Sequence, residues 1–202
     1  VKLLGQGLAI LVLFLGGVRI QSVDFLGLGL DLGAPSVTFH AFGRSDTFGL
    51  PSLLATALWF LGCMNIWNLI DGMDGLASGV GLLVAGTLML VAISLSNFGS
   101  ALMGAALAGG LAGFLLYNWH PACIFLGDSG SLLIGMLIGV IGIQGSLKGT
   151  MAVSILLPIL AMGLPISDTA LAIFRRWVRN LPLTAADRRH VHHVLIGLGL
   201  GP

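Results

Sequence analysis

Residues 76–96 read Leu-Ala-Ser-Gly-Val-Gly-Leu-Leu-Val-Ala-Gly-Thr-Leu-Met-Leu-Val-Ala-Ile-Ser-Leu-Ser, without a single charged side chain. A helix of about 20 apolar residues crosses the roughly 30 Å hydrocarbon core of a bilayer. The whole chain of 202 residues has this character, with 56% hydrophobic residues, 8% charged residues and a mean hydropathy of +1.03. Soluble domains carry about 25% charged residues. The sequence therefore predicts an integral membrane protein, and its net charge of +1 gives no reason to expect a nucleic-acid partner.

Other apolar stretches predict the remaining spans. A stretch of about 17 to 25 apolar residues is long enough to cross a bilayer. The sequence contains six, at 3–18, 50–68, 76–96, 99–117, 129–145 and 149–174. The last contains Pro158 and Pro165, which should kink or divide it. The expected fold is all-α, a polytopic transmembrane bundle, and residues 1–202 are expected to form one membrane domain.

The longest connection between these spans, residues 19–49, separates the first two. From Arg19 to Gly33 it alternates loosely between apolar and polar residues and contains glycine turns. Alternation with a period of two is typical of a half-buried β-strand, and glycine commonly supplies the turn between two strands. This stretch therefore predicts a small β-hairpin at the membrane surface.

The order of the spans determines on which membrane face the polar residues lie. Three polar clusters lie at junctions that follow a span, near residues 68–75, 118–128 and 175–193. Counting spans puts all three on the face that Lys2 occupies, together with five arginines between residues 175 and 189. The opposite face has Arg19, Arg44 and Lys148. Because cytoplasmic loops carry an excess of Lys and Arg, the clusters are predicted to be cytoplasmic and the hairpin extracytoplasmic.

The first cluster reads Asn65-Ile-Trp-Asn68-Leu-Ile-Asp71-Gly-Met-Asp74-Gly75. Its polar side chains recur at every third residue, so in helical turns they would project to one side. Oxygen ligands at this spacing suit Mg²⁺, which usually takes one or two protein carboxylates and leaves other positions to water or substrate phosphate. The plain alternative is a solvated Asp-Gly loop between two spans.

The second cluster is the sequence Asp128-Ser-Gly-Ser at the start of the span 129–145. A helix start presents free backbone N–H groups and the positive end of the helix dipole, which attract anions such as phosphate. The alternative is a helix N-cap. Phe125, three residues earlier, either packs against a flat base or lies in the apolar interface, and Asn118 in the same loop is a weaker candidate.

The third cluster is Arg188-Arg189-His190-Val-His192-His193. Its imidazoles suit a transition metal, a phosphate or a proton transfer. The H-x-H-H spacing is a weak match to a zinc site. Imidazoles beside two arginines fit a polyanionic substrate better.

The order of these motifs resembles a known family. It runs Asn65-x-x-Asn68-x-x-Asp71-Gly-x-Asp74-Gly, then Asn118-x-x-Pro121-Ala-x-x-Phe125-Leu-Gly-Asp128-Ser-Gly-Ser, then Asp187-Arg-Arg-His190-Val-His192-His193. This order closely resembles the polyprenyl-phosphate N-acetylhexosamine-1-phosphate transferases, which are glycosyltransferase-4-like membrane enzymes. The last string is similar to the UDP-N-acetylglucosamine branch. The resemblance implies transfer of a sugar 1-phosphate from a UDP-N-acetylhexosamine to polyprenyl phosphate, with Mg²⁺ and release of UMP, at the cytoplasmic face of the bacterial plasma membrane.

The same resemblance implies roles for single residues. Asp128 would be the principal Mg²⁺ ligand with Asn68 beside it, and Mn²⁺ is the alternative metal. Asp71 and Asp74 would line the nucleotide-sugar site as catalytic groups, and Phe125 would stack on uracil. The remaining substrate contacts implied are Asn65, Asn118, Arg188 and Arg189. The catalytic histidines, implied to meet the diphosphate or hold their loop, are His190, His192 and His193.

The chain departs from this family in one respect, and other functions stay open. Family members have more spans and a paired Asp-Asp motif, which this sequence lacks, so a fragment without the N-terminal spans is expected. A homodimer is left open. The alternatives are a phospho-N-acetylmuramoyl-pentapeptide transferase, a cation transporter and a non-catalytic membrane scaffold. A transporter would place polar residues at mid-membrane depth, whereas the motifs here lie at span ends.

Overall fold

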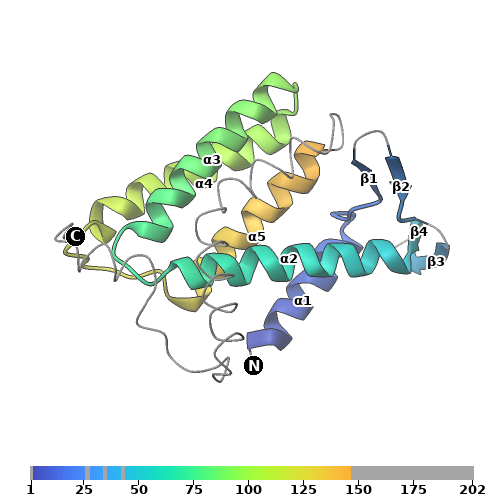
Figure 1. Cartoon of the computed structure of the whole chain (residues 1–202), viewed down its shortest axis with the longest axis horizontal. Coiled ribbons are helices and arrows are strands. Elements are labelled where there is room, and N and C mark those ends of the chain that lie inside the picture. Colours follow the sequence, from blue (N-terminus) through green and yellow to red (C-terminus); the bar gives the residue numbers. More distant parts are fainter. Residues whose placement is uncertain (1, 26–27, 34–35, 42–43, 147–202) are drawn as a thin grey trace, which may run out of the picture. The chain divides into compact units, whose positions relative to one another are not determined.

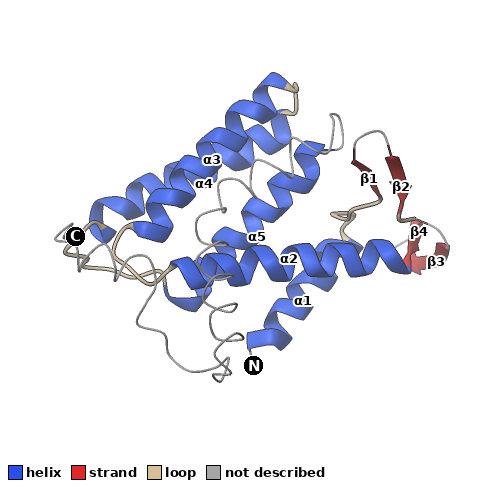
Figure 2. Ribbon diagram, in the orientation of Figure 1, coloured by secondary structure: helices blue, strands red, loops and turns tan. Residues whose placement is uncertain are grey.

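Helices make up most of the described chain (Figure 2). The computed structural model describes residues 2–146 except 26–27, 34–35 and 42–43, and the side chains of 23–29, 34–46 and 146 are not described either. The helices are α1 Lys2–Leu15, α2 Leu50–Ile70, α3 Leu76–Ser94, α4 Phe98–Asn118 and α5 Gly127–Ser146 (Figure 1). The predicted sixth span, 149–174, and the third polar cluster lie outside the described residues. The expectation of one domain over 1–202 stays a prediction.

Four helices are long and apolar enough to cross a membrane, namely α2, α3, α4 and α5. They confirm the predicted all-α membrane fold and four of its spans. Helix α1 differs from the predicted span 3–18 because it has 14 residues, which give about 21 Å at 1.5 Å per residue. It ends where Gly17 takes a φ of +89°, and the N–H of Val18 bonds to the carbonyl of Leu13 at 3.0 Å. Glycine adopts this left-handed conformation at little cost and so ends the helix.

Two hairpins connect α1 to α2. Strands β1 Ser22–Phe25 and β2 Leu28–Asp31 pair antiparallel with Ser22 opposite Asp31, which confirms the predicted hairpin. Strands β3 Ser36–Ala41 and β4 Arg44–Gly49 form a second antiparallel pair that the sequence had not predicted. The sequence of β4, Arg-Ser-Asp-Thr-Phe-Gly, is rich in residues typical of turns, so it does not predict a strand.

The helices pack as two pairs, α3 against α4 and α2 against α5, and α5 also contacts α3 and α4. Glycines bring α5 very close to α2. A Cβ on Gly135 would lie 2.5 Å from the carbonyl oxygen of Cys63, and one on Gly139 would lie 3.0 Å from the ring of Phe60. Small residues four apart let two membrane helices meet through their backbones. The α2–α5 contact is therefore tight, with Phe60 and Ile138 fully buried.

The two pairs bring four helix ends together. The side chain of Asn68 near the end of α2 bonds to Asp128 at the start of α5. Asn118 at the end of α4 bonds to Gly75 at the start of α3. A bond from the N–H of Ala122 to Asp74 joins the two connections. The first and second polar clusters therefore lie at one end of the bundle, as the span count predicted.

Candidate functional site

Asn68 and Asp128 form the centre of the polar end. The Asn68 Nδ2 donates to Asp128 Oδ1 at 2.8 Å and to Ser131 Oγ at 2.9 Å. Ser131 is fully buried, and its hydroxyl lies 2.9 Å from the Gly127 carbonyl. The Asp128 side chain is 70% exposed. The amide therefore orients a carboxylate that still faces solvent.

Lys2 and Gln6 complete this arrangement from α1. The Lys2 Nζ donates to Asn68 Oδ1 and lies 3.8 Å from Asp128 Oδ2. One helical turn later, Gln6 Nε2 donates to Asn65 Oδ1 at 3.2 Å, and Asn65 Nδ2 donates to Gln6 Oε1 at 3.4 Å. Lys2 had been interpreted only as a marker of topology, and Gln6 was missed. The signal was their spacing, since residues four apart share one helix face.

The donor set of this cluster fits a hard divalent cation. Asn68 Oδ1 and Asp128 Oδ2 both face the Lys2 ammonium, so two oxygens already gather around one positive charge. Within the described residues, no group of three or more His, Cys, Asp or Glu side chains gathers in one place. A cation held here would therefore take few protein ligands and fill its shell with water or phosphate oxygens, as Mg²⁺ commonly does.

Asp71 follows α2 directly and is half-buried. Burial raises the pKa of its carboxyl, and the negative charge of Asp128 raises it further. The second cause means that the two carboxylates lie within electrostatic reach of each other. A cation at this end of the bundle would relieve that repulsion.

Asp74 has different surroundings, because α2 ends at Ile70 and residues 71–75 form turns. Its Oδ2 accepts from the N–H of Ala122 at 3.1 Å and lies 3.0 Å from His120 Nδ1. These two contacts, the backbone bond first, hold the pKa of the Asp74 carboxyl below its usual range. The expected helical stripe from Asn68 through Asp74 is therefore wrong beyond the helix end, and Asp74 is bonded to the connection between α4 and α5.

Asn118 is a buried structural link. Its Oδ1 accepts from Ser78 Oγ at 2.7 Å and from the N–H of Gly75 at 3.2 Å, and its Nδ2 donates to the Ile124 carbonyl at 2.9 Å. Gly75 has a φ of +71°, which favours glycine there. These bonds fix the connection between α4 and α5. A direct contact of Asn118 with substrate stays a prediction.

Phe125 is 72% exposed in that connection. Its ring is therefore accessible to a flat ligand, and its role in stacking stays a prediction. The cluster that contains Arg188, Arg189, His190, His192 and His193 lies outside the described residues.

Comparison with known proteins identifies relatives along most of the chain. The model of the family described as Glycosyl transferase family 4 matches residues 1–146. A probable undecaprenyl-phosphate N-acetylglucosaminyl 1-phosphate transferase of Bacillus subtilis is 41% identical over 145 residues, which are 72% of this chain and 40% of that protein. A decaprenyl-phosphate N-acetylglucosaminephosphotransferase of Mycolicibacterium smegmatis is 33% identical, over 96% of this chain and 52% of that protein.

A second activity occurs among the relatives. A phospho-N-acetylmuramoyl-pentapeptide-transferase of Halalkalibacterium halodurans is 38% identical over 71% of this chain and 41% of that protein. The chain thus spans about half the length, or less, of these relatives.

Proposed function

This chain belongs to glycosyl transferase family 4, and on that premise we propose that the protein transfers N-acetylglucosamine 1-phosphate from UDP-N-acetylglucosamine to polyprenyl phosphate. The reaction releases UMP. It takes place at the cytoplasmic face of the bacterial plasma membrane. The excess of Lys and Arg on the membrane face that carries the three polar clusters supports this orientation.

The carboxylate of Asp128 carries this proposal. It is exposed, it is oriented by the Asn68 amide, and it lies beside the Lys2 ammonium at the start of a membrane helix. Phosphoryl transfer depends on positioning and on charge stabilisation more than on covalent chemistry by the protein. A charged cluster at the membrane surface suits a reaction between a water-soluble diphosphate and a lipid phosphate.

The reaction consists of one displacement at phosphorus. An oxygen of the polyprenyl phosphate attacks the phosphorus that bears the sugar. A new P–O bond forms, the bond to the bridging oxygen breaks, and UMP leaves with that oxygen and its electron pair. Bound Mg²⁺, or Mn²⁺ in its place, would neutralise charge on the phosphate oxygens. Asn68 and Asp128 are the residues that would hold the cation.

Other residues bind and orient the two substrates. The Lys2 ammonium and the free N–H groups at the start of α5 attract phosphate. The exposed ring of Phe125 offers a stacking surface for uracil. We assign His190, His192 and His193, with Arg188 and Arg189, to contacts with the diphosphate. Asp71 and Asp74 line the nucleotide-sugar side.

The sugar is inferred from the extent of similarity. The relatives named for N-acetylglucosamine transfer align over as much as 96% of this chain, whereas the one named for the muramoyl-pentapeptide aligns over 71%. The string Asp187-Arg-Arg-His190-Val-His192-His193 is also similar to the N-acetylglucosamine branch. The muramoyl-pentapeptide reaction is the second candidate because its relatives share the described residues.

Purified full-length protein in detergent tests the proposal. UMP release is measured with UDP-N-acetylglucosamine and, separately, with UDP-N-acetylmuramoyl-pentapeptide, each with undecaprenyl phosphate and Mg²⁺. We expect release with the first donor that requires the lipid acceptor. Release only with the second donor would overturn the sugar assignment. No release with either donor would overturn the proposed function.

A further inference from the structure

His120 lies just after the end of α4, and the proposed reaction leaves it without a role. Its Nδ1 lies 3.0 Å from Oδ2 of Asp74, which belongs to the turns between α2 and α3 and is 46 residues away in sequence. An ionised carboxylate only accepts hydrogen bonds, and the lowered pKa of Asp74 keeps it ionised at neutral pH. The hydrogen of this bond therefore belongs to the imidazole, whose Nδ1–H donates to Asp74.

Both hydrogen bonds to the Asp74 carboxylate end on the same oxygen. Oδ2 accepts from His120 and, at 3.1 Å, from the N–H of Ala122. Within the described part of the chain, Oδ1 accepts no hydrogen bond, so this oxygen is available to a ligand. A single bond would leave the carboxylate free to rotate about its side-chain torsions. Two donors on Oδ2 fix the plane of the group and thereby the direction of Oδ1.

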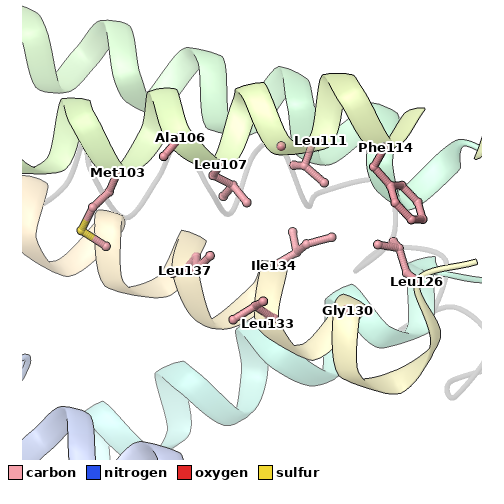
Figure 3. Close-up of a pocket in the computed structure, with 11 residues that line it drawn as sticks. Met103, Ala106, Leu107, Leu111, Phe114, Leu126, Gly130, Leu133, Ile134 and Leu137 are labelled. Carbon is pink, nitrogen blue, oxygen red and sulfur yellow. The ribbon is translucent and has the colours of Figure 1, made fainter. Parts of the chain in front are cut away.

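Other contacts already hold the α4–α5 connection in place. The buried Asn118 amide joins it to the start of α3. Figure 3 shows Phe114 of α4 and Leu126, just before α5, pointing toward each other at the end of a groove whose lining residues are all apolar. The imidazole of His120 is 50% exposed and the Asp74 side chain 28%. A pair this exposed contributes little to stability, so its effect lies in orientation rather than in folding.

We propose that His120 is a positioning residue, which holds the Asp74 carboxylate so that Oδ1 accepts a hydrogen bond from the UDP-sugar. The proposal rests on the proposed function, in which Asp74 lines the nucleotide-sugar side, and adds the residue that orients this carboxylate. Its support is that both groups bonded to Asp74 come from the connection that also carries the exposed ring of Phe125. The apolar groove between α4 and α5 offers no side-chain hydrogen bond to a UDP-sugar, whereas this connection does.

Three variants at position 120 separate the two nitrogens of the imidazole. Nδ1 of histidine and Nδ2 of asparagine are both bonded to Cγ, so His120→Asn keeps an N–H donor near the position of Nδ1 and removes Nε2. His120→Gln places its amide nitrogen one bond further along, near the position of Nε2. His120→Leu introduces a side chain with the shape of asparagine but without a hydrogen-bond donor. Asparagine and leucine are therefore a matched pair.

The first measurement is the KM of the full-length protein for UDP-N-acetylglucosamine. His120→Leu should raise this KM about tenfold, because the substrate then meets a carboxylate whose orientation is no longer fixed. His120→Asn should keep the KM of the native protein, and His120→Gln should behave like His120→Leu. The kcat, the KM for undecaprenyl phosphate and the melting temperature should stay near the native values in all three variants. A higher KM with unchanged kcat indicates lost substrate binding.

A second measurement tests whether His120 acts through Asp74. Asp74→Ala removes the carboxylate and should itself raise the KM for the UDP-sugar. Adding His120→Leu to Asp74→Ala should change this KM no further, because two residues that act through one bond are not additive in a double-mutant cycle. A second rise of similar size in the double variant would show that His120 acts independently of Asp74 and would overturn the positioning role.

The remaining outcomes also decide the question. Native KM in His120→Gln with a raised KM in His120→Asn would show that Nε2 contacts the substrate, which would overturn the positioning role. A native KM in His120→Leu, or a rise that appears only with a lower melting temperature, would overturn it while UMP release upheld the proposed function. If His120→Leu does not fold, the comparison of asparagine with glutamine carries the test. Absence of UMP release by the native protein would instead overturn the proposed function.

Discussion

The side-chain amide of Asn68 forms hydrogen bonds with two groups of opposite charge. Its nitrogen donates to Asp128, and its oxygen accepts from Lys2. Asn68 and Asp128 are 60 residues apart in sequence. The neutral amide can serve both partners because it offers donors at one atom and an acceptor at the other.

The charge of Asp128 is predicted to be essential for turnover. Asp128→Asn keeps the size of the side chain but removes the charge that a divalent cation needs. We expect UMP release by the full-length protein to fall at least about 100-fold, or roughly 3 kcal/mol of barrier. Asp31→Asn is the control, since Asp31 accepts from the N–H of Gly33 in the first hairpin, which an amide oxygen also does. Turnover near that of the native protein in Asp128→Asn would contradict the metal assignment.

Lys2 is predicted to compete with the divalent cation. In Lys2→Met the ammonium no longer neutralises Asn68 Oδ1 and Asp128 Oδ2, so a cation should bind more tightly. The gain expected from one partly exposed ion pair is about 1 kcal/mol, or roughly fivefold in Kd. Titration with Mn²⁺ followed by electron paramagnetic resonance measures it without turnover. Lys2→Arg keeps the charge and should bind Mn²⁺ as the native protein does, and equal Kd values in all three proteins would refute the competition.

Asp71 is predicted to make stability depend on pH. Its pKa is raised, by burial first and by the Asp128 charge second, so the folded state holds its proton more tightly than the unfolded state does. Its contribution to stability is therefore largest below the ordinary pKa of about 3.9 and decreases as the pH rises through the raised value.

The variant Asp71→Asn tests this dependence. Without divalent cations, its melting temperature in detergent should exceed that of the native protein at pH 7 by more than it does at pH 4. Added Mg²⁺ should narrow the difference at pH 7, because a cation offsets the repulsion between the carboxylates. The same difference at both pH values would contradict the assigned cause.

Residue-scale prediction from sequence succeeded where spacing and motif order were informative. The pairing of Asn68 with Asp128 had been implied by family resemblance, and the structure brings the two side chains together. The spacing of Lys2 and Gln6 indicates only that they share one helix face. Their partners on α2 could not be predicted, because they are about 60 positions away in sequence and depend on how α1 packs. The different surroundings of Asp71 and Asp74 could not be predicted either, because they depend on the end of α2 at Ile70.

At the scale of elements, the connection between α4 and α5 is held by side chains from other segments. Asn118 makes three bonds that join it to the start of α3 and to the Ile124 carbonyl. Asp74 bonds to the N–H of Ala122. This connection carries Phe125 and leads into Asp128, so its position determines theirs.

Loss of the Asn118 side chain is predicted to lower the free energy of unfolding more than loss of Asn97, the N-cap residue of α4. Asn118→Leu leaves buried partners without their bonds, and we expect a cost of about 3 kcal/mol. Asn97→Ala at the opposite end of α4 removes a bond from the Ser100 N–H and one to the Gln144 carbonyl, at about 1 kcal/mol. Chemical denaturation in detergent measures both. Only Asn118→Leu should also lower turnover, and equal effects of the two variants would contradict the role of this link.

Hydropathy predicted the long helices because a bilayer requires that length of apolar residues. It could not determine the end of α1, which depends on the left-handed turn at Gly17. The second hairpin was missed because Arg44–Gly49 has only one β-branched residue, Thr47, and is rich in residues typical of turns.

At the scale of the whole molecule, span counting placed the first two clusters together, and the helix ends bear this out. The side of the membrane on which they lie is a prediction that labelling can test. Cys63 is buried and Cys123 is exposed, so both are first replaced by serine.

Single cysteines are then introduced at Gly72, at Ser129 and at Ser45 in the second hairpin. In whole cells, Ser45→Cys should react with an impermeant thiol reagent, whereas the other two should react only with a permeant one. The physical reason is that the two connections and the hairpin lie at opposite ends of membrane helices. Labelling of Gly72→Cys or Ser129→Cys from outside would contradict the cytoplasmic site.

The backbone contact between α2 and α5 at Gly135 also determines how the protein responds to bilayer thickness. Membrane helices tilt when the hydrocarbon core becomes thinner or thicker. Because no side chain separates α2 from α5 at this contact, the two helices tilt together, and Asn68 keeps its distance from Asp128. A change in bilayer thickness should therefore leave the geometry of the charged cluster unchanged.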